Sequence, residues 1–207
     1  MDKRLNIVFI PPKEIVDHSI RLCEEIKREN EVSFLLDGIN NNPHVTIYQM
    51  VIPGWNLERL VEKLDQTIKN FNAQKFIFTD FQEHSGFLGA SFKLTESIKR
   101  VQEEIVEQIT ELREGRNILE VDDPAVEDWP ESHRQIVADY GFDNLFDFYN
   151  PHITITRLPD FEKARDLAGK LSWPFAEFES NSIGLCELGD FGTCNKLVKE
   201  FKLAAAN

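Results

Sequence analysis

The sequence predicts an α+β fold of two pseudo-symmetric β-α-β-β lobes with largely antiparallel sheets around a central cleft. The main observation is a repeat: NPHVTI at residues 42–47 returns as NPHITI at residues 150–155. Each copy opens the same order of expected elements, namely a strand, a stop containing proline, a capped amphipathic helix and two further strands. A long unit that occurs only twice does not fit a solenoid, so two lobes that face each other fit it better.

We expect one bilobal domain over residues 1–207, with lobe one at about residues 35–115 and lobe two at about residues 145–205. The chain has 207 residues, of which 42% are hydrophobic, enough for a sizeable core. No apolar run can span a bilayer, and the apolar stretch near Met1 is too short for a signal peptide. The sequence therefore favours a cytoplasmic protein without membrane contact, and we expect a monomer.

In the first half, helical spacing and β-branched alternation distinguish the elements. Asn56 can cap the second helix, and Thr95 starts the third. The expected elements are a strand over 5–10, a helix over 14–30, a strand over 44–52, a helix over 57–71, a hairpin of strands over 75–81 and 86–94 joined by QEHS, and a helix over 95–112.

The second half repeats this alternation after an acidic connection. Asp160 is expected to cap the last helix. The expected elements are a short helix over 132–140, a strand over 152–158, a helix over 161–171, and strands within 175–189 and 195–203 separated by a turn at DFGTC.

Charge and cysteine usage exclude several function classes. The net charge is −13, whereas a protein that grips long nucleic acid needs positive charge for the phosphates. Three cysteines show no metal-ligand or C-x-x-C spacing. Cys186 and Cys194 could face each other across a hairpin, but free thiols in a reducing compartment are the better interpretation.

The repeated motif divides each strand into a polar and an apolar face, because alternate side chains of a strand share a face. His44 and Thr46 therefore point to one side, and so do His152 and Thr154. By the same alternation, Tyr48 and Thr156 continue the polar faces, as candidates for substrate binding. A single copy would be read as a turn with a structural histidine, but two copies in matching positions favour function.

Two imidazoles and two hydroxyls that face each other suit the cleavage of a phosphodiester. One neutral histidine can remove a proton from water or a hydroxyl, and one protonated histidine can give a proton to the leaving oxygen. Each threonine hydroxyl can donate to a nonbridging phosphoryl oxygen. A zinc site would need a third ligand near the histidines, and none is spaced to supply one, so we expect no cofactor and no metal.

These paired H-x-T strands resemble those of the two-histidine (2H) phosphoesterase superfamily, which includes 2'-5' RNA ligase-like proteins and cyclic nucleotide phosphodiesterases. NPHITITR, GFLGASFKL and the closing segment from SIGLCELG also look like the family's pattern, and the resemblance covers most of the chain. It implies two α+β lobes around a cleft, His44 and His152 as the acid–base pair, Thr46 and Thr154 as phosphate ligands, and no required metal.

The resemblance further implies a 2',3'-cyclic phosphate hydrolase, which opens the ring to a 2'-phosphate. The acidic composition departs from members that act on RNA, so we expect a small nucleotide or related phosphodiester as the partner, and extended nucleic acid is not expected. The alternatives are a non-catalytic module that binds a nucleotide or an RNA end, and a 2'-5' RNA ligase.

Other candidates are weaker. Arg157 points away from the cleft by strict alternation, so a structural ion pair is favoured over a phosphate contact. Tyr48 stacks on a base or packs on its neighbours. His84 reads as a solvated hairpin residue, and His18 and His133 lack a catalytic context. The acidic stretch 120–131 is a solvated connection or, less favoured, a lid.

Overall fold

The structure is a computed structural model that describes residues 1–119, 126 and 128–205. Part of the acidic stretch 120–131 therefore lies outside the described residues. The α-helices and strands of the structure are β1 (Asp2–Phe9), α1 (Lys13–Glu29), β2 (Val45–Pro53), α2 (Leu57–Ile68), β3 (Gln74–His84), β4 (Phe87–Phe92), α3 (Glu96–Ile109), α4 (Glu131–Tyr140), β5 (His152–Arg157), α5 (Phe161–Ala168), β6 (Glu177–Ser180), β7 (Ser182–Leu188) and β8 (Cys194–Lys202). This confirms the predicted α+β class.

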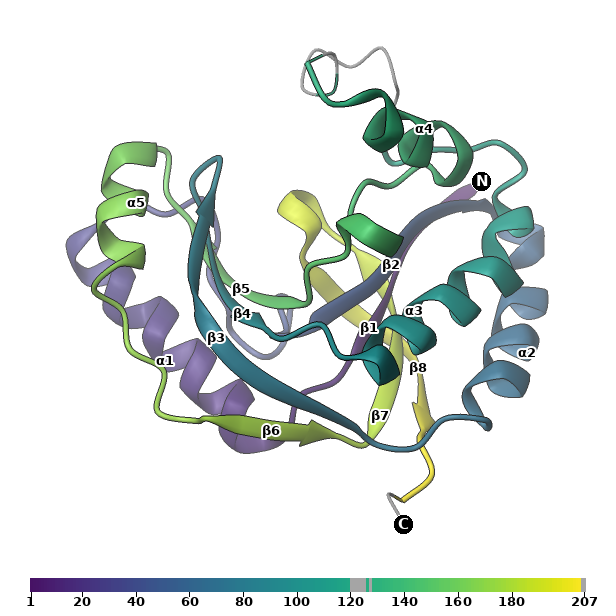
Figure 1. Ribbon diagram of the computed structural model, residues 1–207, viewed down its shortest axis with the longest axis horizontal. Coiled ribbons are helices and arrows are strands. Elements are labelled where there is room, and N and C mark those ends of the chain that lie inside the picture. The colour runs from purple at the N-terminus through teal and green to yellow at the C-terminus, as the bar shows by residue number, and fades with distance from the viewer. Residues whose placement is uncertain (120–125, 127, 206–207) are drawn as a thin grey trace.

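The described strands form two antiparallel sheets, ordered β2-β1-β7-β8 and β5-β4-β3-β6 (Figure 1). The sheets do not follow the consecutive division of the chain expected above. The motif strand β2 pairs with β1 from the N-terminus, whereas β3 and β4 join the sheet that contains the second motif strand, β5. Each sheet thus takes strands from both halves of the chain.

The helices cover the outer faces of these sheets. α1 and α5 contact the sheet that contains β5, and α2 and α3 contact each other and the sheet that contains β2 (Figure 1). The apolar side chains of both motif strands, including Val45, Ile47, Ile153 and Ile155, are fully buried in one continuous core. The other face of each motif strand is left for the cleft between the sheets.

The helix starts show how local sequence and tertiary contacts compete. Thr95 and Asp160 cap α3 and α5, since their side chains accept from the backbone N–H of Ile98 and Lys163. Asn56 precedes α2 but does not cap it.

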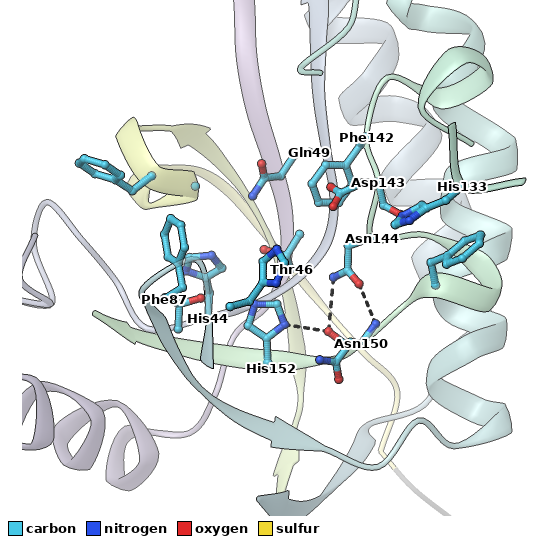
Figure 2. A pocket seen from close by; sticks show the side chains of 15 residues that line it. His44, Thr46, Gln49, Phe87, His133, Phe142, Asp143, Asn144, Asn150 and His152 are labelled. Carbon is cyan, nitrogen blue, oxygen red and sulfur yellow. Dashed lines mark hydrogen bonds between the residues drawn. The ribbon is translucent and has the colours of Figure 1, made fainter. Parts of the chain in front are cut away.

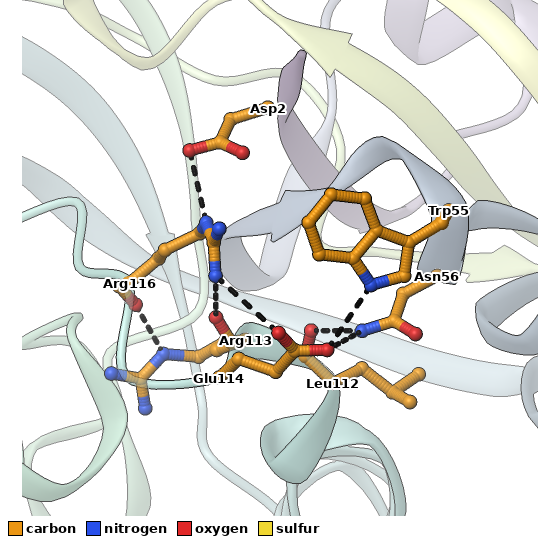
Figure 3. Close-up of polar contacts among 7 residues, drawn as sticks. All are labelled: Asp2, Trp55, Asn56, Leu112, Arg113, Glu114 and Arg116. Atoms are coloured by element: carbon orange, nitrogen blue, oxygen red, sulfur yellow. Dashed lines mark hydrogen bonds and ion pairs between the residues drawn. The ribbon is translucent and has the colours of Figure 1, made fainter.

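The Asn56 amide instead holds the turn after α3. Its Nδ2 donates to the carbonyl of Leu112 and to Glu114 Oε1, both at 2.9 Å, and Arg116 bonds Asp2 nearby (Figure 3). These contacts fasten the segment after α3 to the start of β1 and of α2.

The hairpin of β3 and β4 turns at Ser85 and Gly86, not over the whole of QEHS. These two residues have φ angles of 50° and 86°, the left-handed conformation of a tight hairpin turn. A Cβ on Gly86 would lie 2.2 Å from the carbonyl oxygen of Leu158, so only glycine fits. His84 consequently belongs to the end of β3.

Cys186 and Cys194 form a disulfide across β7 and β8, with Cα atoms 5.7 Å apart, which corrects the expectation of free thiols. Cys23 is free and buried. In the described part of the chain, no helix is both long and apolar enough to cross a membrane.

Candidate active site

The two motifs meet in one pocket of about 300 Å³ that lies between the sheets (Figure 2). His44 stands immediately before β2, and His152 is the first residue of β5. Both histidines and the hydroxyls of Thr46 and Thr154 line the pocket. The structure therefore brings together the four residues that the repeat singles out, although they come from strands of different sheets.

The asparagine of each hexapeptide fixes the histidine that follows it. His44 Nδ1 bonds the carbonyl of Asn42 at 2.7 Å, and His152 Nδ1 bonds the carbonyl of Asn150 at 2.8 Å. A carbonyl oxygen only accepts, so Nδ1 carries the hydrogen in both rings. Each neutral imidazole is thus held in the tautomer that leaves the lone pair on Nε2, the nitrogen away from the asparagine carbonyl.

The two asparagines are themselves anchored, by different neighbours. Asn42 donates through its backbone N–H and its side chain to the carbonyl of Cys194, at 3.0 and 3.2 Å. Asn144 brackets Asn150: its Oδ1 accepts from the backbone N–H at 2.7 Å, and its Nδ2 donates to the carbonyl at 3.3 Å (Figure 2). The carbonyl that orients His152 is therefore held from two sides.

Tyr149 joins the two motifs directly. This residue precedes the second hexapeptide and is 4% exposed, and its hydroxyl donates to the carbonyl of Thr46 at 2.8 Å. Burial raises the pKa of the Tyr149 hydroxyl well above its usual range, so it remains a neutral donor. The bond fixes the spacing between the motif strands of the two sheets.

A bulge in each motif strand breaks the alternation that placed Tyr48 and Thr156 on the cleft face. In the register, Ile47 lies between the paired Thr46 and Tyr48, and Ile155 lies between the paired Thr154 and Thr156. A bulge directs two consecutive side chains to the same side, here the core.

The expected places of Tyr48 and Thr156 are therefore corrected. Both side chains are fully buried. Tyr48 donates to the carbonyl of Tyr140 at 2.7 Å, and Thr156 donates to the carbonyl of Phe34 at 2.8 Å. Neither lines the pocket.

The bulge also changes the place of the residue that follows. In the first copy this residue is Gln49, which lines the pocket. In the second it is Arg157, which donates to the carbonyl of Ser85 at 3.2 Å and lies over the rings of Phe87 and Phe191 at 5.3 and 5.7 Å. Arg157 makes no ion pair with a described residue, and it supports two aromatic rings of the pocket instead of lining it.

Asn6 contacts two of the pocket residues from behind, and the sequence pattern did not single it out. It lies on β1, is fully buried, and its Nδ2 is 3.3 Å from both His44 Nε2 and Thr46 Oγ1. The amide can donate to His44 only when Nε2 carries a lone pair, so it favours the neutral ring. The signal was an asparagine inside the otherwise apolar run LNIVFI.

The electrostatic surroundings of the two histidines differ. The pKa of His44 is lowered to about 4, chiefly by burial and also by the nearby His152, against the raising effect of its bond to the Asn42 carbonyl. Burial also lowers the pKa of His152, but the Asn150 carbonyl and the carboxylate of Asp143 act in the opposite direction. His152 thus has a carboxylate in its surroundings, and His44 has an amide donor.

Two further histidines line the same pocket, although neither had a catalytic context in the sequence. His84 stands at the end of β3, and His133 belongs to α4. His133 is stacked between Trp129 and Phe148, with ring centroids 4.4 and 3.9 Å apart. Four of the five histidines of the chain therefore meet here, a convergence that no local spacing indicates. Among the described residues, no group of three or more His, Cys, Asp or Glu side chains is arranged to hold a metal ion.

The chain matches no protein-family model and no curated protein sequence. Its fold is similar to solved structures over almost its whole length. Escherichia coli LigT, complexed with 3'-AMP, has a TM-score of 0.58 at 12% identity, covering 98% of each chain. A protein described as a phosphoesterase has a TM-score of 0.57 at 12% identity, covering 98% of this chain and 99% of that one.

Usb1 of Kluyveromyces marxianus is similar at a TM-score of 0.52 and 12% identity, covering 97% of this chain and 98% of that one. Identities of this size show a shared fold. The chain therefore shares its overall fold with LigT, with this phosphoesterase and with Usb1.

Proposed function

We propose that this protein is a metal-independent phosphodiesterase that acts on a small nucleotide, as a 2',3'-cyclic phosphate hydrolase. One observation carries the proposal: two histidines with the same Nδ1-to-carbonyl bond line one pocket together with the two motif threonines. Paired imidazoles of this kind suit general acid–base catalysis at a phosphoryl centre. The similar folds of LigT and of a phosphoesterase support this class of reaction.

In the proposed step, His44 is the base and His152 is the acid. Asn6 Nδ2 releases His44 Nε2, which takes a proton from water; the water oxygen attacks phosphorus, the bond from phosphorus to O3' breaks, and His152 Nε2 gives its proton to O3'. The product is a nucleoside 2'-phosphate. The assignment rests on the surroundings: Asn6 favours a neutral His44, whereas the carboxylate of Asp143 opposes the burial that lowers the pKa of His152.

The threonines serve as phosphate ligands in this proposal. Thr46 Oγ1 accepts from Asn6 Nδ2 at 3.3 Å, which leaves the hydroxyl hydrogen free to donate to a nonbridging oxygen. Thr154 stands at the matching position of the second motif and lines the same pocket. E. coli LigT, whose fold is similar, has been solved with phosphate and with 3'-AMP, ligands of the chemical class proposed here.

The direct test is a panel of the four nucleoside 2',3'-cyclic phosphates, assayed with and without EDTA. We expect turnover that survives chelation. His44→Ala and His152→Ala should each lower kcat/KM by roughly 10²–10⁴-fold, the usual contribution of one positioned proton-transfer group. Tight binding of these nucleotides without turnover would favour the non-catalytic alternative, and loss of turnover with EDTA that zinc restores would refute the mechanism.

The two roles are separated by the leaving group. A 4-nitrophenyl nucleotide diester releases a stable anion that does not need a proton in the transition state. On this substrate, His152→Ala should regain most of its lost rate relative to wild type, while His44→Ala should remain as impaired as on the cyclic substrate. The opposite pattern would exchange the two roles.

A further inference from the structure

The pocket is unusual for a phosphate site in its charge. A depression of about 270 Å³ adjoins the pocket, and the two share His84, Phe87, Asn150, His152 and Thr154. Among the described residues, no lysine or arginine lines either of them. Two carboxylates are present, Asp143 in the pocket and Glu83 in the depression. The positive charge that normally favours polyphosphates is thus missing from the lining.

Of these two carboxylates, Glu83 is already engaged. Its Oε1 accepts from the backbone N–H of Gly86 at 2.7 Å, and its Oε2 faces Arg165 at 3.9 Å. The side-chain oxygens of Asp143, by contrast, make no hydrogen bond or ion pair with any residue that the structure describes. Asp143 is therefore the one of these two carboxylates that is not bound by a described cation, although it acts electrostatically on His152.

Asp143 is held in place by its backbone. Its carbonyl lies 3.1 Å from His133 Nε2 and accepts from the backbone N–H of Leu145 at 2.9 Å. The next residue, Asn144, is tied to Asn150 on both sides. Figure 2 places Asp143 between Phe142 and Asn144, on the side of the pocket across from Phe87. The backbone that carries the Asp143 side chain is therefore held by hydrogen bonds at Asp143 and at Asn144.

The wall of the pocket across from Asp143 is aromatic. Phe87 and Phe191 line it, and the guanidinium of Arg157 lies over both rings. An aromatic wall supported in this way suits a nucleobase. With the base on this wall and the cyclic phosphate at the histidines, the 5' side of the ribose extends toward Asp143, because C1' and C4' lie on opposite sides of the sugar.

We propose that Asp143 is a specificity-determining residue, which restricts the pocket to nucleoside cyclic phosphates with a free 5'-hydroxyl and rejects those with a 5'-phosphate. This inference rests on the proposed function and names its substrate class. The carboxylate accepts a hydrogen bond from a hydroxyl, whereas it repels a second phosphate in a partly buried site, where such repulsion is weakly screened. Specificity of this kind comes from a repulsive element that acts on the wrong substrate.

The test compares adenosine 2',3'-cyclic phosphate with its 5'-phosphorylated form. We expect wild type to prefer the 5'-hydroxyl form by roughly 10–100-fold in kcat/KM. Asp143→Asn keeps the size of the side chain and should reduce this preference about tenfold or more, because kcat/KM for the 5'-phosphorylated form rises relative to that for the 5'-hydroxyl form. Any effect of Asp143 on His152 is common to both substrates and cancels in the ratio.

Asp147→Asn is the matched control. Asp147 lies four residues further on, is 88% exposed in its side chain, pairs with Lys99 at 2.9 Å and does not line the pocket, so the ratio should stay unchanged. A wild type that uses both substrates equally, or an Asp143→Asn ratio equal to that of wild type, would overturn the inference while leaving the phosphodiesterase in place.

A binding measurement separates this outcome from a failure of the proposed function. Calorimetry compares the binding of the product 2'-AMP, which has a free 5'-hydroxyl, with that of adenosine 2',5'-bisphosphate, and it needs no turnover. We expect 2'-AMP to bind wild type more tightly, and Asp143→Asn to narrow the difference. If neither substrate is turned over but this binding pattern holds, the proposed hydrolase activity is refuted and the discrimination by Asp143 is supported. If there is no turnover and neither compound binds, the activity and the discrimination are both refuted.

Discussion

The lowered pKa of His44 predicts a loss of stability on acidification that belongs to this one residue. The imidazole has a pKa of about 4 in the folded protein, against an ordinary value of 6.5. Between these values the unfolded chain binds a proton that the folded chain does not, so the free energy of unfolding rises with pH over this window. The difference corresponds to about 3 kcal/mol, present above pH 6.5 and lost as the pH falls to 4.

His44→Gln isolates this contribution, because glutamine does not titrate and still offers an amide to Asn6 and Asn42. Urea unfolding can be followed by the fluorescence of the three tryptophans from pH 4 to pH 8. The free energy of unfolding of wild type minus that of His44→Gln should be constant above pH 7 and fall by about 3 kcal/mol between pH 6.5 and 4. Groups that do not interact with His44 contribute equally to both proteins and cancel in the difference.

The pKa of His44 also determines how kcat/KM should depend on pH. At pH 7 only about one His44 in a thousand carries a proton, so the base is ready for use. In the free enzyme, kcat/KM should lose its acid limb near pH 4, and its upper limb should lie below 6.5, where His152 loses its proton. A difference curve that stays flat down to pH 4, or an NMR titration that places His44 near 6.5, would refute the reasoning.

Two further predictions concern the supports of the site. Tyr149→Phe removes the donor to the Thr46 carbonyl and should lower the free energy of unfolding by about 1–3 kcal/mol together with kcat, measured by urea unfolding and by turnover; unchanged values of both would show that the bond does not fix the motif strands. Cys194→Ser removes a disulfide that closes a span of 8 residues and should lower the free energy of unfolding by about 2–3 kcal/mol. Wild type in reductant should match this variant, and an insensitivity of wild type to reductant would contradict the prediction.

The sequence predicted the elements and the four motif residues because both depend on local patterns. Thr95 and Asp160 cap the helices that their spacing indicated. The repeated hexapeptide placed His44 and His152 at the starts of strands, and the pocket brings them together. Each of these predictions needs only the residue and its neighbours within about one turn or one strand.

The errors arose where distant segments decide the outcome. The bulges at Ile47 and Ile155 depend on how β1 and β4 pair with the motif strands, so alternation alone misplaced Tyr48 and Thr156. The exchange of strands between the sheets depends on the same long-range pairing. Asn56 failed as a cap because a carbonyl after α3 is a competing partner for its amide.

Repetition explains what the two histidines share, and residues outside the repeat explain how they can differ. The hexapeptide gives both rings the same bond to an asparagine carbonyl, hence the same tautomer. Two groups with the same environment would have the same intrinsic pKa, so the environment would not decide which one is the base and which the acid. The asymmetry is supplied by Asn6 on β1 and by Asp143 after α4, which follow no common motif. Exchanging the two hexapeptides should therefore leave the proposed roles in place, whereas Asn6→Asp, which sets a carboxylate against His44, should raise the pKa of His44 and move the acid limb of kcat/KM upward.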